Sequence, residues 1–195
     1  GGELVGQAIK KNKVEYIDKV HGNSKGWITR SCIDENGYSQ WHYKYKELKE
    51  TDLTEENIYI TLNTFFKPYR RLECIKELNA LFIDLDYYKT KFTKEQIIMN
   101  LEENYFNKTI PATNYILDSG RGLALIWLIN KVPSKALPLW KAIEEYLYNK
   151  LKEFGADRQA LDATRILRVP GSINSKSKTV VSIIDEYDYI YDLRE

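Results

Sequence analysis

The stretch ALFIDLDYYK, residues 80–89, places two aspartates inside an otherwise apolar run. Its apolar content and length predict a strand over residues 80–88. Side chains two positions apart in a strand point to the same face, so Asp84 and Asp86 should project together. Two neighbouring carboxylates repel each other and are costly to desolvate, which makes sense if a divalent cation such as Mg²⁺ or Mn²⁺ lies between them. The alternative is a strand end that reaches solvent, where an Arg or a Lys pairs with each aspartate.

The segments around this strand predict a mixed α and β domain. Before it, residues 27–33 and 55–66 are expected to be strands and residues 68–79 a short helix. After it, the patterns predict a helix over 93–106 capped by Thr93, two strands within 113–130, a helix over 134–155 ending at Gly155, and a strand over 179–184. From residue 80 onward this β-α-β-β-α-β order is the ferredoxin-like, RNA-recognition-type arrangement, and the fold class is α/β (α+β). We expect residues 1–79 to form a smaller α/β unit that packs against a unit of residues 80–195.

Bulk properties exclude several classes of protein. The chain of 195 residues has a formal net charge of +1, so no overall field favours nucleic acid or a membrane. Cys32 and Cys74 are far apart and form no CxxC pattern, which argues against a zinc knuckle or a disulfide framework. No apolar run reaches transmembrane length, and the first residues lack a signal-peptide core. We therefore expect a cytoplasmic protein with no membrane partner.

A glycine-rich turn separates the two strands predicted within residues 113–130. It consists of Ser119, Gly120, Arg121 and Gly122. Glycines let the backbone approach a ligand closely, while the serine hydroxyl and the arginine can hold phosphate oxygens. A plain hairpin turn is the alternative. Because the first and third strands of a β-α-β-β-α-β sheet are neighbours, the turn and the aspartate pair should face one site.

A basic segment lies further along the chain. Between Ala163 and Ile184 there is no acidic residue. The cations of this segment, which suit a triphosphate or a nucleic-acid backbone, are Arg165, Arg168, Lys176 and Lys178. Asp162 or Asp157, just ahead of the segment, could supply a third metal ligand. The alternatives are a solvated loop for the cations and a capping role for each aspartate.

A fourth cluster combines cations with aromatic side chains. In NTFFKPYRR, residues 63–71, phenylalanines and a tyrosine accompany Lys67, Arg70 and Arg71. This combination suits the stacking of single-stranded nucleic acid. The alternative is a loop with exposed aromatic and cationic side chains.

The order and spacing of these motifs are more specific than any one of them. FIDLD, then SGRGL, then D-x-x-R-x-x-R-V-P-G-S-x-N resemble the catalytic domain of the archaeo-eukaryotic primase superfamily, above all the primase or primase–polymerase domains in replication proteins of plasmids and other mobile elements. The resemblance covers roughly residues 55–185. It implies primer synthesis from NTP or dNTP on a single-stranded DNA template, with two divalent ions (Mg²⁺ or Mn²⁺) held by three acids.

The resemblance also implies roles for residues of this chain. Asp84 and Asp86 match the metal-binding pair, and residues 119–122 match the nucleotide-phosphate turn. Asp162, which opens the R-V-P-G segment, is the expected third acid, with Asp157 as the alternative and Asp185 as a more distant one. Arg165, Arg168 and Lys176 match the positions that hold triphosphate or template, and the expected further DNA contacts are Lys67, Arg70, Arg71 and Lys178.

One position departs from the family pattern. The second motif usually has a histidine on the strand after the turn, where it contacts nucleotide phosphate. Here that place is Ala124, and the only histidines are His21 and His42. Arg121 could supply the charge instead, which is the interpretation we favour. Otherwise the position has been mutated, or the domain binds nucleotide or single-stranded DNA with weak or no polymerase activity.

Other classes of protein fit less well. An HUH-type replication nuclease needs an H-x-H metal pair, which the sequence lacks. An RNA-recognition module carries aromatic side chains on its central strands, where this chain has Asp84 and Asp86. A cyclic-oligonucleotide synthase would share the paired acids but lack R-V-P-G-S-x-N. A non-catalytic nucleic-acid-binding domain is the main alternative. Because the chain stops shortly after the last predicted strand, we expect a domain of a longer replication protein that carries a helicase or an accessory domain.

Overall fold

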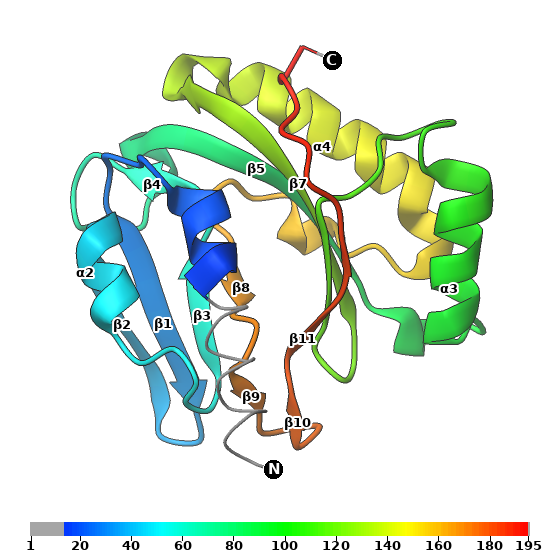
Figure 1. Cartoon of the computed structure of the whole chain (residues 1–195), viewed down its shortest axis with the longest axis horizontal. Helices are drawn as coiled ribbons and strands as arrows, with labels where there is room; N and C mark the ends of the chain where they lie inside the picture. The colour runs from blue at the N-terminus through cyan, green and yellow to red at the C-terminus, as the bar shows by residue number, and fades with distance from the viewer. Residues whose placement is uncertain (1–13, 195) are drawn as a thin grey trace.

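The computed structural model describes residues 14–194, which form two antiparallel sheets side by side (Figure 1). The smaller sheet has four strands in the order β2-β1-β3-β8. Their bounds are β2 (Gly37–Tyr43), β1 (Ile28–Asp34), β3 (Ile58–Thr61) and β8 (Ile166–Arg168). A helix over residues 14–21 and α2 (Tyr45–Glu50) cover one face, because apolar side chains of both helices are buried against it.

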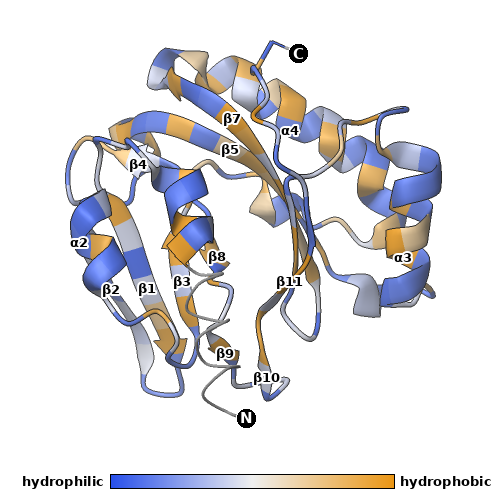
Figure 2. Ribbon diagram, viewed as in Figure 1, coloured by the Kyte–Doolittle hydropathy of each residue, from blue (hydrophilic) through white to orange (hydrophobic). Residues whose placement is uncertain are grey.

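The larger sheet has five strands in the order β11-β6-β7-β5-β4. Their bounds are β11 (Ser182–Glu186), β6 (Tyr115–Asp118), β7 (Leu123–Pro133), β5 (Ile75–Leu85) and β4 (Thr64–Phe65). Two helices, α3 (Lys94–Asn100) and α4 (Leu137–Leu151), lie on the side away from the smaller sheet (Figure 1). Apolar residues recur along β5, β7 and α4 (Figure 2), and they build the core between this sheet and its helices.

Short elements connect the two sheets. A small hairpin pairs β9 (Ile173–Asn174) with β10 (Thr179–Val180). A single π-helical turn, η3 (Leu101–Tyr105), extends α3. The 3₁₀ turns are η1 (Leu72–Cys74), η2 (Tyr87–Lys89), η4 (Ser134–Ala136), η5 (Lys152–Phe154) and η6 (Arg158–Ala160).

Several local predictions are confirmed. Thr93 caps α3 through a capping box, since its side chain accepts from the Gln96 amide and the Gln96 side chain accepts from the Thr93 amide. Strands β6 and β7 form the hairpin expected around residues 119–122. Gly155 ends the α4–η5 helix in the left-handed conformation, at φ 84°.

The prediction of a helix over residues 68–79 is wrong. Strand β5 already begins at Ile75, and only η1 precedes it. The Glu77 carboxylate accepts hydrogen bonds from the amides of Lys25 and Gly26 and from the Thr64 hydroxyl, which fixes this part of the chain as a strand. Tertiary pairing therefore outweighs the local helical pattern.

The sheet order also differs from the ferredoxin-like arrangement at one edge. The predicted neighbours β5 and β7 do pair, but β11 joins β6 instead of β5. The other edge of β5 is already occupied. β4 pairs with its first half, the Trp140 indole donates to the Ala80 carbonyl at 2.8 Å, and the Phe82 amide donates to Glu144 at 2.9 Å. Helix α4 thus seals the edge that a fourth strand would need.

The two predicted units share strands. The predicted boundary after residue 79 falls inside β5, and β8 returns from the second half of the chain to pair with β3. This crossing brings the basic segment of β8 opposite the end of β5. Within residues 14–194, no helix is long and apolar enough to cross a lipid bilayer.

Candidate active site

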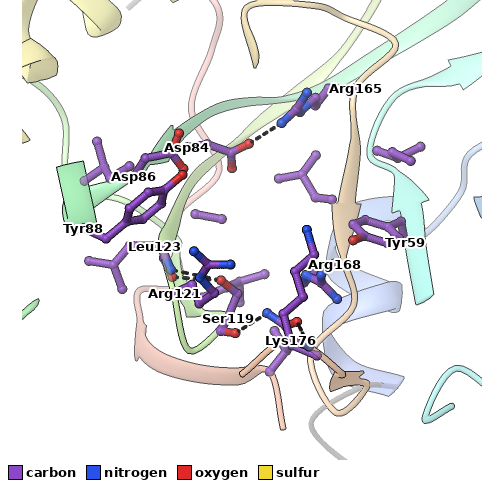
Figure 3. A pocket seen from close by; sticks show the side chains of 18 residues that line it. Tyr59, Asp84, Asp86, Tyr88, Ser119, Arg121, Leu123, Arg165, Arg168 and Lys176 are labelled. Atoms are coloured by element: carbon purple, nitrogen blue, oxygen red, sulfur yellow. Dashed lines mark hydrogen bonds and ion pairs between the residues drawn. The ribbon is translucent and has the colours of Figure 1, made fainter. Parts of the chain in front are cut away.

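A cavity of about 330 Å³ opens between the two sheets. One wall is the end of β5 with the β6–β7 turn, and the other is formed by β3 and β8. Figure 3 shows Asp84, Asp86 and Tyr88 on one side and Tyr59 on the other, with Arg121, Arg168 and Lys176 around the lower rim. Three sequence motifs that are far apart in the chain therefore meet at one place.

The aspartate pair lies at the end of β5. Asp84 is the penultimate strand residue and Asp86 follows the strand directly. Their side chains are about a quarter exposed, and both line the cavity. Each also has a cationic neighbour: Asp84 accepts from Arg165 at 3.1 Å, and Asp86 lies 3.6 Å from Lys89. The pair thus faces a cavity and is partly neutralised.

Burial raises the pKa of Asp84 above its ordinary value. The Arg165 guanidinium acts in the opposite direction, while the negative charges of Asp86 and Asp157 add to the increase. A carboxylate in this position is therefore under-compensated even with Arg165 beside it. An additional cation would relieve that imbalance.

The residue that approaches the pair is Asp157. Its amide donates to the Asp84 carbonyl at 2.9 Å, and its carboxylate lies 3.8 Å from the same Arg165 nitrogen that contacts Asp84. The Asp86 amide donates in turn to the Gly155 carbonyl at 2.8 Å. A Cβ at Gly155 would come within 2.6 Å of the Asp86 carbonyl oxygen, so glycine is needed for this close approach.

The expected third acid, Asp162, lies elsewhere. Its Oδ1 accepts from the Thr164 amide and the Thr164 hydroxyl, both at 2.9 Å, and it does not line the cavity. The side chain closes the turn that leads into β8, which is the capping role left open as its alternative. Asp185 lies on the edge strand β11, where its carboxylate accepts from the next amide. Asp157 does not line the cavity either, and it also caps a turn through the Gln159 amide, but of the three candidates it alone shares a cation with Asp84, so the geometry favours Asp157.

The glycine-rich turn is held in a defined shape. The Ser119 amide donates to the Gly122 carbonyl at 3.1 Å, and the Gly122 amide donates to the Ser119 hydroxyl at 3.2 Å. Gly120 has φ 90°, and a Cβ there would meet the side chains of Ser177 and Thr179. Asn174 of β9 donates to the Ser119 carbonyl at 2.7 Å. The β9–β10 hairpin thus braces the turn at the cavity rim.

Ala124 lies where the missing histidine would point into the cavity. It pairs with Asp84 across β5 and β7, so both side chains are on one face, and it lines the cavity. In the part of the chain that the structure describes, no histidine lines this cavity, since His21 is buried against Thr61 and His42 contacts Thr29. The positive charge around the cavity comes from Arg121, Arg165, Arg168 and Lys176.

The remaining predicted cations lie outside the cavity. Arg70 donates to the Thr164 carbonyl at 2.9 Å and to the Tyr38 hydroxyl at 3.3 Å. Arg71 lies 4.5 Å from the Tyr69 ring centre. Lys67 is exposed in the same loop, and Lys178 is exposed in the β9–β10 turn. None of these four lines the cavity, so any contact with DNA would be outside the reaction centre.

Two tyrosines of the cavity were not predicted from the sequence. Tyr59 on β3 lies beneath the Arg168 guanidinium at 4.8 Å, and Tyr88 lies beneath Arg121 at 5.2 Å. The alternating pattern of residues 58–61 marks Tyr59 as the residue that faces away from the buried isoleucines. This alternation is visible in the sequence, but it does not tell on which face of the sheet the site lies.

The carboxylates that line the cavity are candidate ligands for a divalent cation. Within residues 14–194, no three His, Cys, Asp or Glu side chains are clustered as a preformed metal centre. One Arg165 nitrogen contacts the carboxylates of both Asp84 and Asp157, at 3.1 Å and 3.8 Å. The donors that face the cavity are nonetheless carboxylate oxygens, which suit a hard cation. The donor set fits Mg²⁺ or Mn²⁺.

Comparisons with known proteins concern the fold of the chain and its relatives. No protein-family model matches the sequence. A replication protein from Clostridium perfringens is 76% identical over 188 residues, which are 96% of this chain and 46% of that protein, so the chain spans less than half of its relative. The AEP domain of the cyanophage S-2L primase–polymerase superposes with a TM-score of 0.65 at 14% identity, over 94% of each chain. The catalytic domain of the primase RepB', in complex with initiator DNA, superposes with a TM-score of 0.56 at 12% identity, over 94% of this chain and 88% of that one.

Proposed function

The chain has the fold of archaeo-eukaryotic primase domains, and from this fold and the Asp84–Asp86 pair in its cavity we propose that it synthesises primers on a DNA template by nucleotidyl transfer from NTP or dNTP. The observation that carries the proposal is the pair Asp84 and Asp86 on one side of a cavity whose rim is cationic, with Asp157 held next to Asp84 by the Arg165 guanidinium that both contact. The relative named as a replication protein supports a role in replication. We extend this to a plasmid or another mobile element.

Three carboxylates would hold the metal ions in this proposal. Asp84 and Asp86 keep their predicted role, and Asp157 takes the place first expected for Asp162. Two divalent cations, when bound, would lower the pKa of the attacking 3′-hydroxyl and would supply positive charge at the triphosphate. Arg165 partly balances the carboxylates and is well placed to turn toward a phosphate.

The cationic rim would bind the triphosphate. The turn over residues 119–122 presents backbone and the Ser119 hydroxyl, and Arg121 stands beside it on Tyr88. Arg168 and Lys176 face it from the opposite strand and the hairpin (Figure 3). We propose that Arg121 supplies the charge that a histidine at position 124 would otherwise bring.

A binding domain without polymerase activity is the second candidate. Two features favour it. Arg165 already pairs with Asp84, and Ala124 takes the place of the histidine that is usual in the family, so both reduce the resemblance to a catalytic primase site. In that case the cavity would hold nucleotide or DNA without turnover.

Incorporation of labelled nucleotides on single-stranded DNA tests the proposal. The assay contains Mg²⁺ or Mn²⁺, ribo- or deoxynucleotides and no added primer, and the control is an Asp84→Asn, Asp86→Asn double variant. We expect metal-dependent products that disappear in the double variant. If the folded wild type and its Ala124→His variant both make no product, primer synthesis is rejected and the binding role is retained.

A readout without activity tests the metal site separately. A ligand that binds only the folded state raises its melting temperature. We expect Mn²⁺ to raise the melting temperature of the wild type more than that of the double variant. Equal shifts would contradict the assignment of Asp84 and Asp86 as ligands.

A further inference from the structure

A row of side chains leads from the cavity to the open edge of the four-stranded sheet. Gln40 on β2 pairs with Ser31 on β1, Ser31 pairs with Tyr59 on β3, and Tyr59 pairs with Arg168 on β8. Residues that pair directly across antiparallel strands point to the same face. At about 4.8 Å for each step between strands, the row is roughly 14 Å long. Since Tyr59 and Arg168 line the cavity, the row begins at the candidate active site.

The face that carries this row is polar and has no carboxylate among the described strand residues. The opposite face buries Ile28, Ile58 and Ile60 beneath the two helices. Alternation along the four strands assigns to the polar face Thr29, Ser31, Ile33, Tyr38, Gln40, His42, Tyr59, Thr61, Ile166 and Arg168. Thr29, Ser31 and Thr61 are themselves buried, so the accessible part of this face is formed by the residues near the edge strand and by Tyr59 and Arg168 at the cavity. Its formal charge is that of Arg168, which suits an anionic polymer.

Arg70 extends the positive charge toward the edge strand. It contacts the Tyr38 hydroxyl and the Thr164 carbonyl, and its Nε is buried without a hydrogen-bond partner. The Tyr38 side chain is 48% exposed, and Tyr69 beside Arg71 is 49% exposed. An exposed ring beside a guanidinium group, as in Tyr38 with Arg70, suits a surface on which bases stack while phosphates are neutralised.

We propose that this surface, the edge track formed by Tyr38, Gln40, Tyr59, Arg70 and Arg168, carries single-stranded DNA to the active site. The inference rests on the proposed function, because it names the path of the template. Bases stack on Tyr38, and Arg70 and Arg168 contact the phosphates between. Single strands fit better than a duplex because stacking on an aromatic side chain requires unpaired, exposed base faces. The track gives a role to the N-terminal strands β1 and β2, which lie outside the motifs that carry the resemblance to primases.

A pair of charge substitutions on one strand tests the track. Gln40→Glu puts a carboxylate on the polar face and still accepts from the Tyr38 hydroxyl, whereas Ser39→Glu puts the same charge on the opposite face of β2. Both positions are exposed, so both variants should fold. Binding is measured by fluorescence anisotropy with labelled oligodeoxythymidylates, without nucleotide or metal. We expect Gln40→Glu to weaken binding about fivefold and Ser39→Glu to leave it unchanged.

A second pair separates stacking from hydrogen bonding. Tyr38→Ala removes the ring, while Tyr38→Phe keeps the ring and removes only the hydroxyl that contacts Ser31, Gln40 and Arg70. We expect about a tenfold loss of affinity for Tyr38→Ala and close to wild-type affinity for Tyr38→Phe. Melting temperatures of all four variants check that each is folded.

The outcomes distinguish the track from the primase activity. A wild type that binds single strands, with the expected loss in Gln40→Glu and Tyr38→Ala, supports the track even if it incorporates no nucleotide. Equal affinity of the Gln40→Glu and Ser39→Glu variants would overturn the track even if primers are made. Absence of single-strand binding by the wild type, or equal binding of a duplex with the same sensitivity to these variants, would overturn it as well.

Discussion

The amide of Asp157 donates to the carbonyl oxygen of Asp84 at 2.9 Å, which ties the start of η6 to the strand that carries the aspartate pair. Their carboxylates share one Arg165 nitrogen, at 3.8 Å and 3.1 Å. Both aspartates also cap the turn that follows them, Asp157 by accepting from the Gln159 amide and Asp162 by accepting from the Thr164 amide, each at 2.9 Å. Neither lines the cavity, but of the two only Asp157 shares a cation with Asp84.

This difference predicts that the same substitution, Asp to Asn, has a large effect at position 157 and little effect at position 162. Asp157→Asn removes a charge beside Asp84 and should lower the rate of nucleotide incorporation by at least about a hundredfold, since a lost metal ligand removes several kcal/mol of transition-state stabilisation. Asp162→Asn keeps the oxygen that accepts from Thr164 and should retain close to wild-type activity. Steady-state incorporation rates of the two variants, compared at saturating Mn²⁺, decide the assignment. The reverse order of activities would restore Asp162 as the third acid.

Gly155 provides a structural test of the same contact. Gly155→Ala forces a side chain into a backbone with φ 84° and to within 2.6 Å of the Asp86 carbonyl oxygen, so we expect a loss of at least about 2 kcal/mol in the free energy of unfolding together with a loss of activity. Gly37→Ala is the matched control, because Gly37 also has positive φ (116°) but nothing lies within 4 Å of the added Cβ. It should cost about 1 kcal/mol and leave activity unchanged. Denaturant unfolding and incorporation assays on both variants check this. Equal loss of activity in the two would show that strain alone, without displacement of Asp86, accounts for the effect.

The sequence was sufficient where local pattern and tertiary structure agree. The strand that contains Asp84, the Ser119–Gly122 turn, the Thr93 cap and the Gly155 helix end follow from alternation, turn chemistry and capping. The prediction that this strand extends over residues 80–88 is wrong at its end, because β5 stops at Leu85 and Asp86 precedes the turn η2. It failed where a contact between distant segments decides the outcome. Glu77 is fixed in a strand by amides near residue 25, which no pattern within residues 68–79 can reveal.

The third acid and the sheet edge were unpredictable for the same reason. Asp157 reaches the site because Gly155 allows the chain to pass directly along β5, and the spacing of motifs does not encode that approach. The edge of β5 is closed by Trp140 and Glu144 of α4, so β11 pairs on the other side of the sheet. Both corrections depend on which backbone amides and carbonyls already have a hydrogen-bond partner.

Glu144 predicts a specific dependence of stability on pH. Its carboxyl group is buried, accepts from the Phe82 amide through one oxygen and has a second oxygen without a partner. Burial raises the pKa of Glu144 well above its ordinary value. The folded state therefore holds this proton more tightly than the unfolded state, and stability falls as pH rises from about 4.3, the ordinary value for Glu, toward the folded pKa.

Glu144→Gln should remove that fall, because the amide keeps an oxygen for Phe82 and does not ionise. The difference in unfolding midpoint between variant and wild type should increase with pH over this range. Glu145→Gln is the control, since Glu145 is on the next position of α4, partly exposed and paired with Arg158 at 2.9 Å. Urea unfolding at pH values from about 4 to 8 measures both. Identical pH profiles for wild type and Glu144→Gln would contradict the buried, protonated carboxyl.

The position of Arg121 predicts how the domain binds nucleotide phosphate without a histidine at position 124. Its guanidinium lies 5.2 Å from the Tyr88 ring centre at the cavity rim, beside the turn proposed to hold phosphate. Arg121→Ala should raise the KM for nucleotide about tenfold, because a hydrogen bond to a charged group contributes roughly 1.5–3 kcal/mol. Arg158→Ala removes the same kind of contact, 5.3 Å from the Tyr148 ring, at a place outside the cavity, and should leave KM unchanged. If Arg121→Ala also leaves KM unchanged, Arg168 or Lys176 carries the phosphate charge. An Ala124→His substitution in the Arg121→Ala background then provides the final comparison. A histidine beside Asp84 on the same face of the sheet should restore nucleotide affinity only if Arg121 had replaced it.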